Sequence, residues 1–355
     1  MRTLPTIENA TPMMRQYLET KARFPDAILF FRLGDFYEMF FDDAVEASEI
    51  LDIQLTSRGK DGERFPMCGV PYHAARAYIA KLIEAGKKVA ICDQVAEESL
   101  KGGRKLFRRE VTRIVTPGTV LDEDLLEPRA ANYLATVARI GDRFGLAFLD
   151  ASTGEFLATE LPSLEAAQTE IARFGPREIL VGPEVGELRA PQGSSVRAAE
   201  DAQSFEPRRA ERLLLRHFGV ASLEGFGLGG KAAATAAAGA ALAYLEETQR
   251  GTDATHVDRI HVFHPERHLR LDEASSTNLE LFRTLHGGRK KGSLFGTLDK
   301  TATAMGGRRL LAWLAAPLLD VGAIRARHDA VQELYERAVL RGELVDLLRG
   351  VGDLE

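Results

Sequence analysis

The fold of the first part of this 355-residue chain is decided by the stretch AILFFRLGDFYEMFF, residues 27–41. Residues 27–33 are apolar and aromatic, which favours a buried β-strand. The pair Gly34-Asp35 is a turn or bulge signal, and residues 36–41 continue as extended chain. The sequence therefore predicts two successive extended segments with a sharp change of direction between them.

Helices and further strands are predicted on both sides of this stretch. Thr11 or Asn9 can cap a helix that has Pro12 in its first turn and stops before Pro25. After residue 41 we expect, in order, a helix over 44–51, a strand over 53–57, a loop over 69–73, a helix over 74–86 and strands over 88–92 and 110–115. Because strands alternate with helices, residues 1–116 should form a small α/β domain with a mixed sheet.

Two more parts follow along the chain. Residues 117–128 are acidic, contain proline and read as a linker. Residues 129–262 form a second α/β unit, with strands predicted over 132–138, 145–149, 154–160 and 178–181 and helices over 164–174, 208–218 and 231–250. Residues 263–355 become purely helical from about residue 279 and stop in mid-pattern, so we expect the truncated beginning of an all-helical domain.

The formal net charge of −6 hides an uneven distribution. It is the sum of −5 in residues 1–55, +6 in 56–116, −8 in 117–262 and +1 in 263–355. Within the positive part, residues 101–113 hold six basic side chains and a single acid, Glu110. Such a run can follow a phosphate backbone. The alternative is a solvated loop or strand without a partner.

Cysteine content and hydropathy point to the cytoplasm. Cys68 and Cys92 are too few for a disulfide scaffold or a four-thiolate zinc site, so we expect free, buried thiols in a reducing compartment. The first residues hold no apolar run fit for a signal peptide, and the Ala-rich segment 232–245 is too short to span a bilayer. The histidines show no metal-site spacing, and no metal site is expected.

Phe36 and Glu38 are two residues apart in an extended segment, so their side chains should point to the same side of a sheet. A phenylalanine can wedge into a base stack. A glutamate beside it would be repelled by phosphates, and it suits DNA only if it accepts a hydrogen bond from a base edge or is protonated in a desolvated site. The alternative is that the six aromatic residues of this region build a core.

Two other patterns suggest chemistry, and each has a structural alternative. The segment Gly225–Ala232 resembles a phosphate loop but has Ala232 where Ser or Thr would hold magnesium, so an ordinary helix N-terminus is the better interpretation. Asp150 ends an apolar strand, where a nuclease could hold a metal with further carboxylates, Glu155, Glu170 or Glu178. A turn-stabilising aspartate explains Asp150 equally well.

Longer stretches of the chain resemble the MutS family of DNA mismatch repair proteins. The stretches are TPMMRQYLETKARFPDAILFFRLGDFYEMFFDDA, LTSRG, PMCGVPYHAARAYIAKLIEAGKKVAICDQV, RIVTPGTVLDE, GLAFLDASTGEF and GSLFGTLDKTATAMGGRRLLAWLAAPLLD, and they follow the family's order. The resemblance implies a multidomain α/β plus α fold: a small mixed-sheet mismatch-binding domain, a ribonuclease-H-like α/β connector and the start of an all-helical core.

The resemblance also assigns roles to particular residues. In the family's Phe-x-Glu motif, here Phe36 and Glu38, the phenylalanine stacks on the mispaired base and the glutamate hydrogen-bonds it. Met67, in the loop 66–69, is expected to line the same minor-groove approach. Charge and position suggest contacts to the DNA backbone by Arg58, Arg76, Arg104, Lys105, Arg108 and Arg109.

The remaining implications concern cofactors and partners. The family's ATPase, with its ATP and magnesium, has no counterpart in these residues, so the chain itself is expected to bind no cofactor and to be no enzyme. The expected partners are mismatched double-stranded DNA and, for the intact protein, a second copy of itself and a MutL-like repair protein. The expected location is the bacterial cytosol or nucleoid, without membrane contact. A nuclease centred on Asp150 and a pure protein-docking scaffold are the alternatives.

Overall fold

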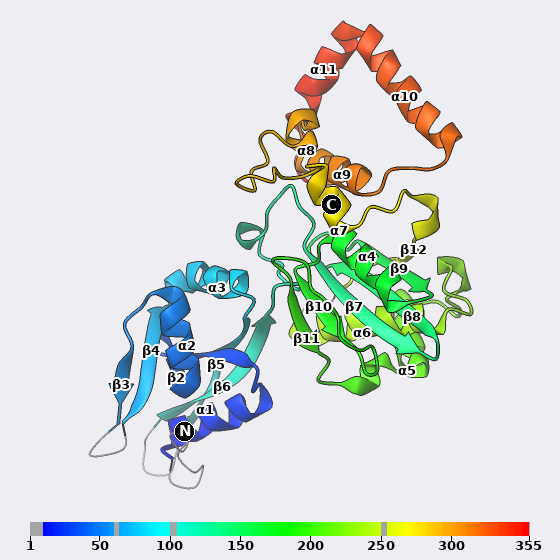
Figure 1. Ribbon diagram of the computed structural model, residues 1–355. Helices are drawn as coiled ribbons and strands as arrows, with labels where there is room; N and C mark the ends of the chain where they lie inside the picture. Colours follow the sequence, from blue (N-terminus) through cyan, green and yellow to red (C-terminus); the bar gives the residue numbers. More distant parts are fainter. Residues whose placement is uncertain (1–9, 60–63, 100–104, 250–253, 355) are drawn as a thin grey trace. The chain divides into compact units, whose positions relative to one another are not determined.

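The computed structural model describes residues 10–59, 64–99, 105–249 and 254–354 (Figure 1). These residues form two compact units. The first unit extends to Thr119 and includes the segment from Tyr244 to Ala254. The second comprises the segments Val120–Ala243 and Thr255–Glu355.

The first unit is built on a six-stranded mixed sheet with the strand order β3-β4-β2-β1-β5-β6. Only β1 and β5 run parallel among these neighbours. The elements are α1 (Pro12–Arg23), β1 (Ala27–Leu33), β2 (Phe36–Phe40), α2 (Phe41–Leu51), β3 (Thr56–Arg58), β4 (Phe65–Pro71), the 3₁₀ helix η2 (Tyr72–Ala74), α3 (Ala75–Glu84), β5 (Lys88–Ser99) and β6 (Lys105–Val115). This arrangement confirms the predicted mixed-sheet α/β fold.

Helices cover both faces of this sheet. On one face, the ring of Tyr17 in α1 packs edge-on against Phe31 and Phe40, with centroids 5.5 and 4.9 Å apart. On the other face, the Cys68 thiol in β4 donates to the carbonyl of Ala44 in α2, and α3 packs beside α2. The aromatic residues of the two central strands therefore hold a core between the helices.

Several predicted boundaries in this unit were wrong. The strands predicted over 88–92 and 110–115 are longer, because β5 extends to Ser99 and β6 begins at Lys105. The segment predicted as a loop over 69–73 is strand up to Pro71, because its backbone pairs with β2 from Phe36 to Phe40. The strand predicted over 53–57 is β3, which is shorter and begins at Thr56. The helix predicted from residue 44 begins three residues earlier, directly after β2.

The second unit contains another six-stranded mixed sheet, with the order β11-β10-β7-β8-β9-β12. Strands β7, β8 and β9 form an antiparallel meander, and β10, β11 and β12 pair in parallel with their neighbours. The elements are β7 (Tyr133–Ile140), β8 (Arg143–Asp150), β9 (Phe156–Leu161), α4 (Leu164–Phe174), β10 (Glu178–Val181), β11 (Ser195–Ala198), η4 (Ala202–Phe205), α5 (Pro207–Phe218), η5 (Glu224–Phe226), α6 (Ala232–Thr248) and β12 (His261–Val262). The predicted α/β connector fold is confirmed.

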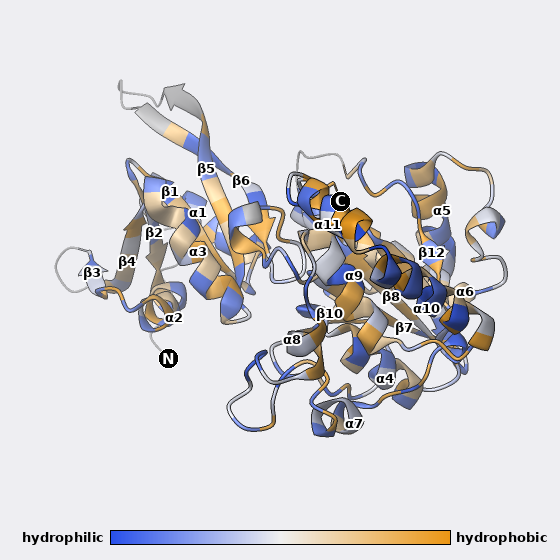
Figure 2. Cartoon of the chain, turned by 90° about the horizontal axis from the view of Figure 1, so that it is seen from above, coloured by the Kyte–Doolittle hydropathy of each residue, from blue (hydrophilic) through white to orange (hydrophobic). Residues whose placement is uncertain are grey.

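The central strands of this second sheet are buried on both faces and appear largely hydrophobic in Figure 2. Helix α4 lies across one face, where Ala167 and Ile171 join the apolar cluster. Helix α6 approaches the other face so closely that a side chain at Gly145 would overlap the backbone of Ala233. Glycine at this position of β8 is therefore required by the close approach of the helix.

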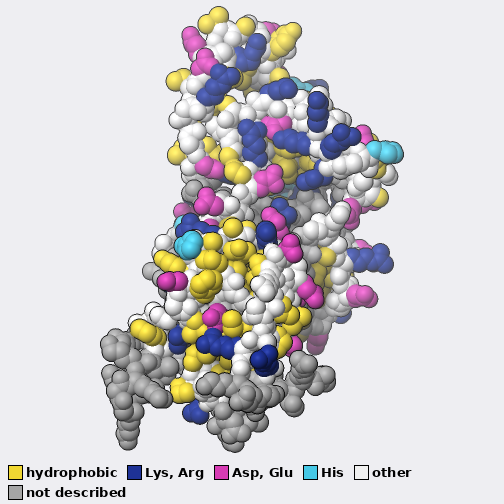
Figure 3. Space-filling view, turned by 90° about the vertical axis from the view of Figure 1, so that its left-hand side faces the viewer, with side chains coloured by type: hydrophobic (Ala, Val, Ile, Leu, Met, Phe, Trp, Pro, Cys, Tyr) yellow, Lys and Arg dark blue, Asp and Glu magenta, His cyan; other side chains and the backbone are white. Residues whose placement is uncertain are grey.

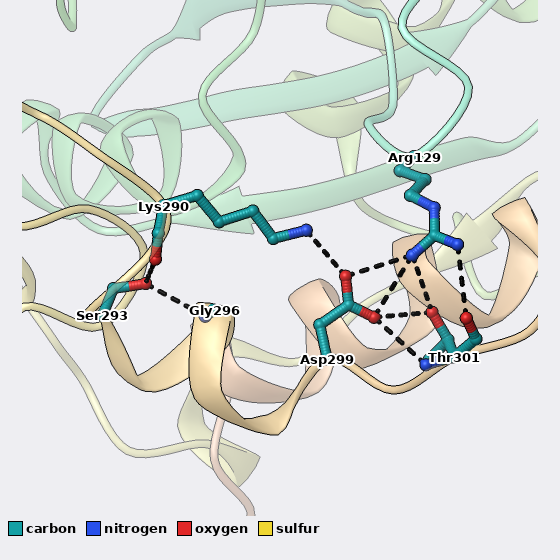
Figure 4. Close-up of polar contacts among 6 residues, drawn as sticks. All are labelled: Arg129, Lys290, Ser293, Gly296, Asp299 and Thr301. Carbon is teal, nitrogen blue, oxygen red and sulfur yellow. Dashed lines mark hydrogen bonds and ion pairs between the residues drawn. The ribbon is translucent and has the colours of Figure 1, made fainter.

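The last part of the chain is largely helical, as predicted, but the prediction of helix from about residue 279 was wrong over 279–293, which form turns and loop before α8. It contains η6 (Pro265–Arg267), α7 (Glu273–Asn278), α8 (Leu294–Leu298), α9 (Ala304–Ala315), α10 (Val321–Glu336) and α11 (Ala338–Leu348). Between α8 and α9, the buried carboxylate of Asp299 accepts from Lys290 at 2.7 Å and from Arg129 at 3.2 Å (Figure 4). Residue 129, which immediately follows the predicted linker, is thereby held at the corner between two helices.

Both cysteines are free and buried, as expected. Burial raises the pKa of the Cys68 thiol to about 11 and that of the Cys92 thiol to about 12. Among the described helices, none is long and apolar enough to cross a bilayer.

Candidate nucleic-acid interface

The corner between β1 and β2 presents a single exposed aromatic side chain. Phe36, the first residue of β2, is 47% exposed, whereas Phe30, Phe31, Tyr37 and Phe40 are buried. Tyr37 points to the opposite face, where its hydroxyl donates to Asp93 at 2.7 Å. The aromatic cluster is thus a core, as one interpretation held, and Phe36 is the member that leaves the core.

Glu38 follows Phe36 on the same face of β2 and forms an ion pair that crosses one intervening strand, β4. Its Oε2 lies 2.6 Å from Nη1 of Arg58 in β3. The strand between them, β4, has Gly69 directly opposite Glu38. A Cβ at Gly69 would lie in ordinary van der Waals contact with Cγ of Glu38, at 3.5 Å, and closer to the carbonyl oxygen of Tyr37, at 3.3 Å.

The surroundings of Glu38 shift the pKa of its carboxyl in opposite directions. Burial of the carboxyl raises its pKa, and the charge and hydrogen bond of Arg58 oppose this shift, with the net pKa above its usual value. Glu38 is 18% exposed at the side chain and Arg58 is 45% exposed. The pair therefore lies at the boundary between the core and solvent.

Met67 lies on the same face of the sheet, two residues from Gly69 along β4. It pairs with Phe40 in β2 and with Thr56 in β3, and it packs against the apolar cluster below α1. The structure thus brings four of the predicted site residues to one face: Phe36, Glu38, Arg58 and Met67.

The other predicted backbone contacts are dispersed. Arg76 is exposed on α3, which covers the opposite face of the sheet. In β6, Arg108 is exposed and pairs with Glu110. Arg109 donates to the carbonyl of Arg32 at 2.7 Å and lies over the ring of Phe31, so its guanidinium already has intramolecular partners. Arg104 lies outside the described residues, and for Lys105 only the backbone, at the start of β6, is described.

The sequence did not predict one contact near Phe36, the stacking of Arg32 on Tyr72. The guanidinium of Arg32 stacks on the exposed ring of Tyr72, 3.6 Å from its centroid, and the backbone amide of Tyr72 donates to Asp35. This contact ties the end of β4 to the turn that precedes Phe36. Among the described residues on the face seen in Figure 3, Lys and Arg side chains lie interspersed with Asp and Glu side chains.

The carboxylate of Asp150 has the partners of a turn-stabilising residue. It is buried at the end of β8 and accepts from the amides of Asn132 and Ser152, at 2.8 and 2.9 Å, and from the Ser152 hydroxyl. The other candidate carboxylates pair elsewhere: Glu155 with Tyr133, Glu170 with Arg173, and Glu178 with Arg197. No group of three potential metal ligands converges within the part of the chain that the structure describes.

The glycine-rich segment before α6 forms the start of that helix. The ammonium of Lys231 donates a hydrogen bond to the carbonyl of Gly227 at 2.6 Å, and the backbone amide of Ala233 donates one to the carboxylate of Glu160. A carboxylate therefore already occupies the position at the helix N-terminus where a phosphate would bind.

Comparison with known proteins gives consistent matches along the chain. Three family models match in succession: MutS domain I over residues 11–124, MutS domain II over 132–258 and MutS domain III over 274–355. Proteins described as DNA mismatch repair protein MutS are similar throughout: 53% identical over 356 residues in Myxococcus xanthus, 56% over 357 in Anaeromyxobacter dehalogenans (strain 2CP-1) and 49% over 358 in Symbiobacterium thermophilum. These alignments cover 98–99% of the chain and 40% of the length of each relative.

Proposed function

The chain belongs to the MutS family of DNA mismatch repair proteins, and from this premise we propose that its first unit recognises mispaired or unpaired bases in duplex DNA. The observation that carries the proposal is the exposure of Phe36. Four other aromatic side chains of the same two strands are buried, yet this one stands in solvent beside a half-buried carboxylate. An exposed phenylalanine gains nothing for the fold, but it suits a probe that enters a base stack.

In the proposed mechanism, a mispair weakens stacking and makes the duplex easier to kink. Phe36 then wedges in from the minor groove, and Glu38 accepts a hydrogen bond from the displaced base. Basic side chains in the 56–116 region hold the backbone without reading sequence. Among the described candidates, Arg58 and Arg108 are exposed arginines on strands of this sheet, and we propose Arg108 for this role.

The steps that follow recognition belong to the intact protein. Because the chain spans 40% of the length of its relatives, we propose that ATP and magnesium bind in the remainder of the polypeptide. ATP binding there would convert recognition into signalling to a MutL-like partner, within a homodimer acting on DNA in the bacterial cytosol. The residues of this chain are proposed to supply DNA recognition and no catalytic group.

The test compares binding of the intact protein to a G·T duplex and to its matched homoduplex. Phe36→Ala should reduce the preference for the mismatch by roughly 5- to 150-fold, because base–aromatic stacking contributes about 1–3 kcal/mol. Val196→Ala, which truncates an exposed apolar side chain of the second sheet, should leave the preference unchanged. An undiminished preference in Phe36→Ala would refute the wedge.

A further inference from the structure

We propose that Arg58 is a positioning residue that acts on the mispaired base through Glu38, and that it is not a contact to the DNA backbone. This inference rests on the proposed function of Glu38 as a hydrogen-bond acceptor. It replaces the expectation from charge alone, which gave Arg58 the same role as the other basic residues of this region.

Three strands bring the two side chains together. Glu38 in β2 and Arg58 in β3 are separated by β4, and the register places Gly69 opposite Glu38 and Phe65 opposite Arg58. Because directly paired residues share a face, all four positions lie on the face that carries Phe36. The guanidinium of Arg58 reaches across β4 to Oε2 of Glu38, at 2.6 Å from Nη1.

This contact determines what Glu38 can offer to a base. With Oε2 bound to Arg58, the other oxygen, Oε1, makes no hydrogen bond with any described residue. This charge-assisted hydrogen bond restricts the rotation of the carboxylate, and Oε1 remains the oxygen that can accept from a base. The base therefore meets an acceptor that is already ordered in the free protein.

The same contact favours the ionised, accepting form of Glu38. Burial alone would favour the protonated carboxyl, which presents a donor on one oxygen, and the charge of Arg58 opposes this. Seating a duplex removes more water from the site and brings phosphate charge nearby, and both effects favour protonation further. Arg58 also neutralises the carboxylate, so an approaching duplex does not meet an uncompensated negative charge.

The two possible roles of Arg58 predict different results for Arg58→Met. Loss of a phosphate contact would weaken binding to matched and mismatched duplexes alike, and would reduce the slope of log K against log salt by about 0.9. Loss of a positioning residue should confine the effect to the mismatched duplex, with roughly a tenfold or larger drop in preference, the loss typical of a charge-assisted hydrogen bond. The salt slope should stay unchanged.

The experiment is a double-mutant cycle in the intact protein, with Arg58→Met, Glu38→Ala and both together, measured on G·T and matched duplexes at several salt concentrations. We expect Arg58→Met to have no further effect on preference in the Glu38→Ala background. Arg143→Met is the matched control, because Arg143 is 54% exposed and pairs with Glu160 across two strands of the second sheet. It should change neither preference nor slope.

A spectroscopic measurement separates positioning from folding. The carboxyl carbon of Glu38, followed by NMR in the free protein, should titrate at higher pH in Arg58→Met than in the wild type. A reduced salt slope, an equal loss on both duplexes or an unchanged titration of Glu38 would overturn the inference and leave the proposed function intact. An unchanged preference in Glu38→Ala would overturn both.

Discussion

Arg129 and Lys290 both pair with Asp299 at the corner between α8 and α9. The losses of unfolding free energy caused by mutating these two cations should be strongly non-additive. Asp299 is 3% exposed at its side chain, whereas its two cationic partners, Arg129 and Lys290, are 42% and 48% exposed (Figure 4). The perturbation is Arg129→Met, Lys290→Met and the double variant. Each single variant leaves the buried carboxylate with one cation, and the double variant leaves it with none.

The magnitudes follow from this geometry. Each cation is half-exposed and screened by solvent, so each single substitution should cost about 1 kcal/mol of unfolding free energy. Removing both leaves a buried carboxylate whose remaining donors are the amide and hydroxyl of Thr301. An uncompensated buried charge costs about 3–5 kcal/mol, so the double variant should lose about 2 kcal/mol more than the two singles combined.

The assay is urea unfolding followed by tryptophan fluorescence. The chain contains one tryptophan, Trp313, and it lies in α9 directly after this corner, so its emission reports on the affected region. A double variant whose loss equals the sum of the single losses within about 0.5 kcal/mol would refute the reasoning.

The pH dependence gives a second check. Burial raises the pKa of Asp299, but the hydrogen bonds from Lys290 and Thr301 outweigh it and hold the pKa below its ordinary value of 3.8. The stability that the ionised carboxylate contributes is therefore present above pH 4 and is lost as pH falls further. In the double variant, fewer hydrogen bonds oppose the effect of burial on the pKa of Asp299, so this pKa should be higher than in the wild type. The difference in unfolding free energy between the wild type and the double variant should therefore narrow as pH falls from 7 to 4.

Three further predictions concern the two sheets. Gly145→Ala should destabilise the chain by about 2 kcal/mol or more in urea unfolding, because its methyl group would overlap the backbone of Ala233. Tyr37→Phe should cost about 1 kcal/mol, through loss of the hydrogen bond to Asp93, and equal melting temperatures would contradict this. Because burial raises the pKa of Glu38, its ionised form disfavours folding above the folded pKa, so Glu38→Gln should stabilise the protein more at pH 7 than at pH 4.

Local pattern predicted the elements well where caps and periodicity were strong. Thr11 caps α1 as expected, and the predicted limits of α4 and β10 agree with the structure. The prediction was wrong over 69–73, where glycine and proline suggested a loop. That segment is a strand because β2 pairs with it along its length, which is a long-range contact that local residue types do not encode.

In the candidate site, too, neighbouring residues predicted some features and long-range contacts set the others. The alternation in β2 predicted from sequence that Phe36 and Glu38 share a face, because side-chain direction in a strand depends only on neighbouring residues. The sequence could not show that Phe36 alone is exposed among these aromatics. That depends on where α1 packs on the sheet, which is set by contacts far apart along the chain.

The family, most of the element types and the positive charge of residues 56–116 could be predicted without a structure, because they are properties of consecutive residues. Tertiary structure decided which of those charges act together. It paired Arg58 with Glu38 across β4, placed Arg109 against β1 and left Arg76 on the opposite face of the sheet. A sheet brings residues 20 positions apart within hydrogen-bond distance, and only the register of its strands specifies which ones.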